Sequence, residues 1–134
     1  MRSILEERIR IWLADPDSSV AYAEQLEGKW AVRVAQESRE ATTVWFWPRE
    51  RSLEYEAYFM PVEVGSSEVL RQALLRNGRA WRAFFALDSE GGLVLRGRVA
   101  ATEVTLEVLD LILGEIVEMV DVAFKAMLRA QRPV

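Results

Sequence analysis

The sequence predicts an α+β protein in which an antiparallel five-stranded sheet carries helices mainly on one face. Three observations lead to this class. Several short segments alternate apolar and polar residues with the two-residue period of a strand, turn residues separate these segments by only a few positions, and both ends of the chain repeat apolar residues with a helical period. The expected order of elements is α-β-β-β-α-β-β-α.

The two terminal helices have recognisable start and stop signals. Ser3 and Glu6 have the spacing of a capping box, and the pair Asp15-Pro16 ends the first helical pattern. Thr105 is a candidate N-cap for a long last helix that extends to about Arg129. The apolar residues of this last helix cover about half of its circumference, which is wider than the ~100° stripe that a core contact needs. Either the helix lies deep in the core with the first helix against its flank, or part of it forms an interface.

The strands follow from alternation between turn signals. A short extended stretch near 20–24 lies in a polar link and is not counted as a strand. A central helix begins at Ser66 or Ser67 and stops at Asn77-Gly78, and the turn DSEGG separates the last two strands. The expected strands are 29–36, 42–47, 53–60, 81–87 and 93–99.

Composition excludes much of the chemistry that enzymes use. The 134 residues form about one domain and contain no cysteine and no histidine, which removes disulfides, thiolate nucleophiles, imidazole bases and most zinc sites. We therefore predict a single domain, residues 1–134, with no enzymatic activity, cofactor or metal. The net charge of -4 argues against non-specific binding of nucleic acid. Charged residues interrupt the N-terminal apolar run and no segment resembles a membrane span, so the expected location is the cytoplasm.

One face of the sheet is predicted to carry exposed aromatic residues. Trp45, Phe46 and Trp47 are consecutive, so their side chains must point to both faces of the sheet. Phe46 and Leu87 are expected in the core under the helices, and so is the alternating set of the third strand, Leu53, Tyr55, Ala57 and Phe59. The candidate partner-binding residues on the opposite face are Trp45, Trp47, Tyr58, Met60 and Phe84. An aromatic patch bordered by charges is typical of a surface that another protein covers, although long arginine stems could shield the rings on a solvated face instead.

Charged residues suggest three further sites. Arg71, Arg76, Arg79 and Arg82 occur near Trp81 with no acidic residue between them, which makes them the alternative anion-binding candidates. Glu54 and Glu56 share one face of a strand and could form a paired-carboxylate site, but ion pairs with nearby arginines are favoured. Asp88 and Glu90 lie in the DSEGG turn, where a simple turn is favoured over a cation loop.

Three stretches of the chain carry a family resemblance. ESREATTVWFWPRERSLEYEAYFMP, then LRQALLRNGRAW and FALDSEGGLVLRGRV, resemble the YbjN-like domain family of bacteria, whose members are described as sensory-transduction regulators. That family is similar to the type III secretion chaperone fold, with the same order of elements. The resemblance implies a cytoplasmic, commonly dimeric protein that binds other proteins and has no established catalytic residues. The chain departs from the family pattern in its Trp-Phe-Trp and in GRAWRAFF.

The residues and the resemblance together predict a non-enzymatic protein-binding module, chaperone-like or regulatory. We expect a homodimer that binds a partner protein or peptide on its aromatic surface. The alternative is a regulator that senses a small anionic ligand or a nucleic acid through the region from Arg71 to Arg82.

Overall fold

A computed structural model of the chain, which describes residues 1–64 and 66–131, contains a six-stranded antiparallel sheet with three α-helices. The helices are α1 (Arg2–Ala14), α2 (Ser67–Asn77) and α3 (Leu106–Ala130), with a short 3-10 helix at Ala101–Glu103. The strands are β1 (Val20–Leu26), β2 (Lys29–Ala35), β3 (Ala41–Pro48), β4 (Ser52–Pro61), β5 (Phe84–Leu87) and β6 (Gly92–Ala100). The sheet order is β1-β2-β3-β4-β6-β5.

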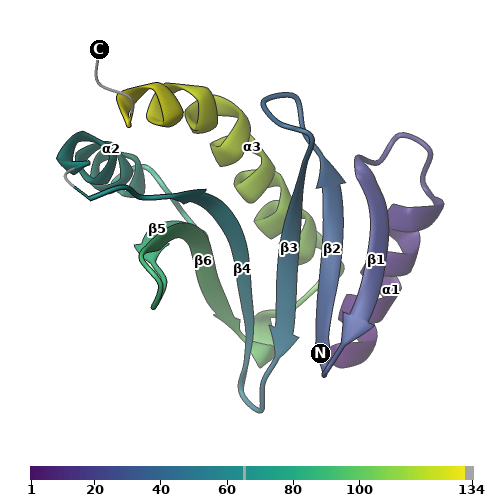
Figure 1. The fold of residues 1–134 in the computed structure, drawn as a ribbon. Helices are drawn as coiled ribbons and strands as arrows, with labels where there is room; N and C mark the ends of the chain where they lie inside the picture. The colour runs from purple at the N-terminus through teal and green to yellow at the C-terminus, as the bar shows by residue number, and fades with distance from the viewer. Residues whose placement is uncertain (65, 132–134) are drawn as a thin grey trace.

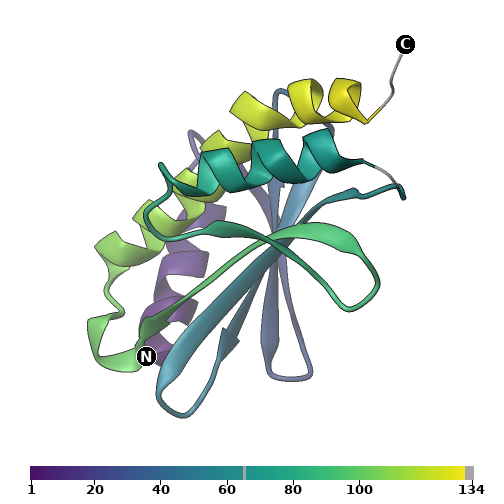
Figure 2. The same cartoon turned by 90° about the vertical axis from the view of Figure 1, so that its left-hand side faces the viewer.

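The helices lie on one side of the sheet. Figure 1 shows α1 and α3 behind the strands, and Figure 2 shows α2 running beside α3. The first four strands form a meander, and β6 then inserts between β4 and β5. One face of the sheet is therefore free of helices, and we call it the outer face.

The expectation of five strands is wrong, because the stretch that follows α1 forms a strand of its own. β1 pairs with β2 through a two-residue turn in which Glu27 and Gly28 both have positive φ, at 51° and 81°. Positive φ at both central residues gives the turn the twist that a tight hairpin needs. Asn-Gly and Asp-Gly are the usual signals for this turn, so Glu-Gly is a weaker one.

The core lies between the sheet and the helices. Leu53, Tyr55, Ala57 and Phe59 alternate along β4 and are all buried, as predicted, and so is Phe46 of β3. The helices contribute a further buried set: Leu5, Ile9, Trp12, Leu109, Ile112, Leu113, Ile116, Val120, Ala123 and Met127.

α1 packs against the flank of α3, so the interpretation of α3 as a core helix is confirmed for its buried face. The Trp12 indole N–H donates to Asp110 at 2.8 Å, and Arg8 pairs with the same carboxylate at 3.0 Å. Thr105 caps α3 as predicted and accepts a hydrogen bond from the Val108 N–H at 3.0 Å. The prediction of a capping box at Ser3 and Glu6 is wrong, because α1 already begins at Arg2 and has no side-chain cap.

A β-bulge in β4 changes the expected position of Met60. Tyr58 pairs with Val94, but Met60 pairs with the next residue, Leu93, so the alternation of faces slips by one position. Met60 is consequently 1% exposed and belongs to the core, whereas the sequence predicts it on the outer face. The prediction that Leu87 lies in the core is also wrong. Leu87 is 51% exposed at the end of the edge strand β5.

No helix in the described part of the chain is both long enough and apolar enough to cross a membrane.

Candidate protein-binding surface

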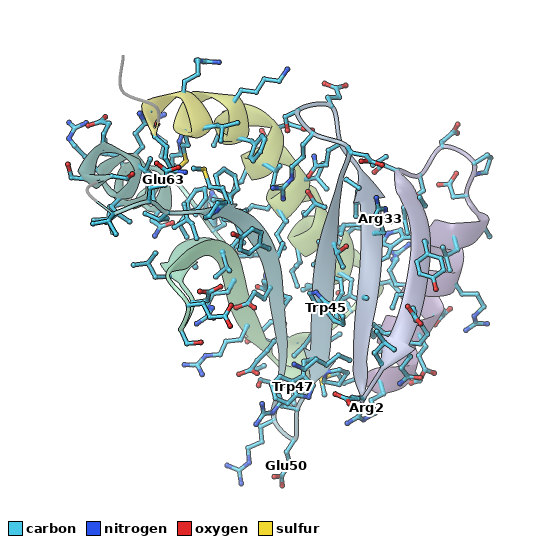
Figure 3. All side chains as sticks on the ribbon, in the orientation of Figure 1. Arg2, Arg33, Trp45, Trp47, Glu50 and Glu63 are labelled. Carbon is cyan, nitrogen blue, oxygen red and sulfur yellow. The ribbon has the colours of Figure 1, made fainter. Side chains whose placement is uncertain are left out.

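Trp45 and Trp47 lie on the outer face of β3, as the sequence predicts. Trp45 is opposite Ala31 of β2 and Glu56 of β4, and Trp47 is opposite Glu54 of β4. Figure 3 shows both indoles on the strand, on the side of the sheet away from the helices. The Trp45 ring is half-buried and the Trp47 ring is exposed, which means that this face is not covered by the chain itself.

Two cations contact the ring of Trp47. The Arg49 guanidinium is 3.8 Å from the ring centroid and the Lys29 ammonium is 4.3 Å from it. These distances are those of cation–π contacts. Shielding of the ring by basic side chains is therefore real, but it is partial, since 36% of Trp47 remains exposed. A partner would meet an indole bordered by positive charge.

The outer face has a concavity that extends from the β1-β2 turn across the sheet to β5. We call this concavity, which has a volume of about 1410 Å³, the outer groove. Its lining residues include Trp45, Trp47, Trp81, Phe84 and Arg96, together with Leu26 from β1. Tyr58 does not line the groove but is exposed on the same face of β4. Aromatic residues from β3, the loop before β5 and β5 therefore surround one concave surface.

Glu54 and Glu56 form ion pairs rather than a paired-carboxylate site. Glu54 pairs with Arg49 at 3.4 Å, and Glu56 accepts from Arg96 Nε at 3.1 Å. Each carboxylate thus has its own cation, and charges of both signs line the outer groove. The DSEGG segment is a turn as expected, since Asp88 accepts hydrogen bonds from the N–H groups of Glu90 and Gly92. The described residues include no group of three or more acidic side chains placed to hold a metal ion.

The loop before β5 is fixed at the rim of the outer groove. The predicted strand 81–87 is shorter than expected, because the Glu115 carboxylate of α3 binds the N–H groups of Trp81, Arg82 and Ala83 at 3.1, 2.9 and 2.9 Å. The Tyr55 hydroxyl donates to the carbonyl of Arg82 at 2.7 Å. Burial raises the pKa of Tyr55 to about 12.

The four candidate anion-binding arginines do not form one cluster. Arg71 pairs with Glu68 at 3.7 Å on α2. Arg76, Arg79 and Arg82 instead line a second concavity, between α2 and α3, which has a volume of about 1280 Å³ and which we call the helix groove. The carboxylates Asp110, Glu115 and Glu118 line the same groove. Acidic residues therefore face the arginines in space, although none separates them in the sequence.

Several exposed apolar residues were missed by sequence reasoning. Tyr22 and Leu26 of β1 are 53% and 43% exposed, and their register places them on the outer face beside Arg33 and Lys29. The sequence signal for them was the two-residue spacing of Tyr22, Glu24 and Leu26, which places all three on one face of a strand. Trp81 is 86% exposed, but its sequence neighbourhood indicates only that arginines are near.

The described residues have an α+β fold that a chain of known structure shares. The chain is similar to a chain from the solved structure of the HopA1–SchA chaperone–effector complex, with a TM-score of 0.61 over 89% of this chain and 88% of that one, at 11% sequence identity. The sequence also matches the model of a family described as "Putative bacterial sensory transduction regulator" over residues 6–129. The chain belongs to this family, YbjN, which confirms the resemblance found in the sequence.

Two curated mycobacterial proteins are similar to part of the chain. Mb0497 of Mycobacterium bovis and Rv0487 of Mycobacterium tuberculosis are each 32% identical to it over 80 residues. The aligned segment covers 59% of this chain and 44% of each relative, so the chain matches less than half of their length.

Proposed function

We propose that this chain is a non-enzymatic, chaperone-like binding module that docks a segment of a partner protein in the outer groove. The observation that carries the proposal is the exposed aromatic set on the helix-free face. Trp47 and Phe84 line the outer groove and are 36% and 40% exposed, and Tyr58 on the same face is 51% exposed. Aromatic residues in a concave surface supply the contact area and the desolvated anchors that protein interfaces use. The similarity in fold to a chain of a chaperone–effector complex supports the same role.

The surface favours a polypeptide over a small ligand. The outer groove is wide, and its fixed charges alternate in sign across β4 and β6, as in the pair of Glu56 with Arg96. Such a surface can align a segment that carries its own mixed charges, because complementary charges fix register more than they raise affinity. We further propose that the protein acts in the bacterial cytoplasm as a homodimer, as the resemblance implies.

Recovery of partners from the native host tests the docking site. We expect cross-linking and mass identification to recover a partner with the unmodified chain and to lose it with the double variant Trp45→Ala/Trp47→Ala. The matched control is Tyr22→Ala, which removes an exposed aromatic ring from the same face outside the outer groove. Urea unfolding of each variant checks that the fold is retained. Recovery of the same partners by the folded double variant would contradict the proposal.

The alternative of anion sensing through Arg71 to Arg82 is less well supported. Arg71 is apart from the other three arginines, and the carboxylates of Asp110 and Glu118 share the helix groove with them. Negative charge on the facing wall opposes a polyanion. A salt-sensitive shift of a nucleic acid in a gel, lost in Arg79→Ala, would favour this alternative.

A further inference from the structure

The helix groove carries four large apolar side chains that are at least half exposed. Leu75, Trp81, Leu111 and Val122 line it and are 58%, 86%, 50% and 64% exposed. They come from α2, from the loop that follows it, and from two successive parts of α3. A contiguous apolar surface with a polar rim is typical of an interface rather than of a solvated face.

Trp81 is a fixed projection rather than a loose side chain on a free loop. Its own N–H and those of the next two residues donate to Glu115, and the following carbonyl, that of Arg82, accepts from the Tyr55 hydroxyl. The backbone beneath the indole is thus held to α3 and to β4 at once. Because the loop is already ordered, contact through Trp81 costs little conformational entropy.

The charges of the helix groove are separated into two rows. Arg76 lies in the last turn of α2 and Arg79 just beyond its end, whereas Asp110 and Glu118 lie on α3. No ion pair joins the two rows in the part of the chain that the structure describes. Asp110 is already paired with Arg8, whereas Arg79 and Glu118 are exposed and form no ion pair with any residue in 1–64 or 66–131.

These features make the surface complementary to itself. A two-fold axis brings the same patch of two subunits together, so that residue i meets residue j while j meets i. A projecting indole and a hollow of about 1280 Å³ occur on the same face, and so do a basic row and an acidic row. A second copy supplies what each element lacks, namely a hollow for the indole and an opposite charge for each row.

We propose that the helix groove is the interface between two copies of this chain. Trp81 of each copy packs against the apolar floor of the other groove, near Leu111 and Val122, and Arg79 faces Glu118 of the partner subunit. This inference rests on the proposed homodimer and gives its location. It uses Trp81 of GRAWRAFF, one of the two stretches in which the chain departs from the family pattern. Trp81 also lines the rim of the outer groove, whose Trp45, Trp47 and Phe84 are not part of the proposed interface.

Sedimentation equilibrium of the full chain tests this interface. We expect the unmodified chain to be a dimer, and Trp81→Ala to raise the dissociation constant at least tenfold. Arg79→Glu and Glu118→Arg should each weaken the dimer, because each places like charges opposite one another. The double variant Arg79→Glu/Glu118→Arg should recover the dimer, since the exchanged charges again face opposite signs. The matched control is Tyr22→Ala, another exposed aromatic residue, which should leave the dissociation constant unchanged.

The outcomes separate this inference from the proposed function. A dimer that Trp81→Ala does not weaken overturns the interface and leaves the homodimer standing. A monomer at high concentration overturns both the homodimer and its interface, whereas partner recovery through Trp45 and Trp47 is decided independently. Single variants that weaken the dimer without recovery in the double variant overturn the pairing of Arg79 with Glu118. A monomer whose recovered partners change with Glu118→Arg, at a position that lines the helix groove and not the outer groove, shows that a different protein occupies the helix groove and overturns the second-copy proposal.

Discussion

The hydroxyl of Tyr55 donates a hydrogen bond to the carbonyl oxygen of Arg82 at 2.7 Å and thereby joins the centre of β4 to the loop that carries Trp81. The carbonyl can approach because β6 has a glycine at this point. A Cβ placed on Gly97 would be 2.1 Å from the Arg82 carbonyl oxygen and 2.8 Å from the Tyr55 hydroxyl. The contact between loop and sheet therefore depends on the absence of a single side chain.

Gly97→Ala should destabilise the protein by about 3 kcal/mol, because the new methyl group overlaps backbone and an aromatic ring that cannot both move. The matched control is Gly114→Ala on α3, where a Cβ meets nothing within 4 Å. Alanine is preferred to glycine inside a helix, so this control should stabilise by roughly 0.5–1 kcal/mol. Urea unfolding at one protein concentration measures both. Equal stability of the two variants would show that the loop does not pack on Gly97.

The titration of Tyr55 predicts a loss of stability at high pH. Burial raises the pKa of this hydroxyl from 10.0 to about 12, so below pH 10 it is protonated in both the folded and the unfolded chain. Between pH 10 and 12 the unfolded chain loses the proton first, and the free energy of unfolding should fall as pH rises. Unfolding in urea at pH 8, 10 and 11 measures this fall.

Tyr55→Phe is the control for that titration. It should cost about 1 kcal/mol at pH 8 through the lost hydrogen bond, and its stability should depend less on pH above 10. Burial also lowers the pKa of the Arg39 guanidinium, but Arg39 is present in both proteins, so its contribution cancels in the comparison. An identical fall with pH in the two proteins would exclude Tyr55 as its cause.

The carboxylate of Glu115 should contribute strongly to stability. Its Oε1 is the acceptor for three consecutive backbone N–H groups, which the sheet and helices leave without another partner. Glu115→Ala should therefore lower the free energy of unfolding by about 2–3 kcal/mol. Glu115→Gln keeps an acceptor oxygen at the same place without the charge, so its loss should be smaller. Urea unfolding ranks the three proteins. A glutamine variant as unstable as the alanine variant would show that a neutral acceptor oxygen at this position does not hold the loop.

Local pattern was sufficient for most of the sheet and for the direction of its aromatic residues. The alternation of Leu53, Tyr55, Ala57 and Phe59 fixed the buried face of β4, and pairing with β3 then placed Trp45 and Trp47 outside. The strand β1 was missed because its signal was weak: the Glu-Gly turn is an uncommon form of a tight hairpin turn.

Other features depended on residues far away in the sequence. The bulge that buries Met60 is accompanied by hydrogen bonds from the Arg39 guanidinium to the carbonyls of Tyr58 and Phe59, about twenty positions along the chain. The exposure of Trp81 likewise depends on Glu115, which lies 34 positions later. No window of neighbouring residues contains either interaction, so periodicity cannot reveal them.

Asn77 closes the free edge of the sheet at β5. Its side-chain oxygen accepts from the N–H of Phe85 at 2.7 Å, and its side-chain N–H donates to the carbonyl of the same residue at 3.0 Å. The amide thus makes the two hydrogen bonds that another strand would make, which protects an edge that would otherwise pair with a second sheet. Asn77 is also the last residue of α2, so it fixes that helix to the sheet.

Asn77→Ala should lower the free energy of unfolding by about 1–3 kcal/mol and should increase aggregation, because both backbone groups of Phe85 lose their partner. Asn77→Asp is the graded control, since its carboxylate can still accept from the N–H but cannot donate to the carbonyl. We expect its stability to fall between the other two. Urea unfolding and light scattering over time measure the two effects. Gly97→Ala is a destabilised variant in which the Asn77 contact with β5 is kept. If it aggregates as much as Asn77→Ala, the aggregation comes from unfolding and not from the open edge of β5.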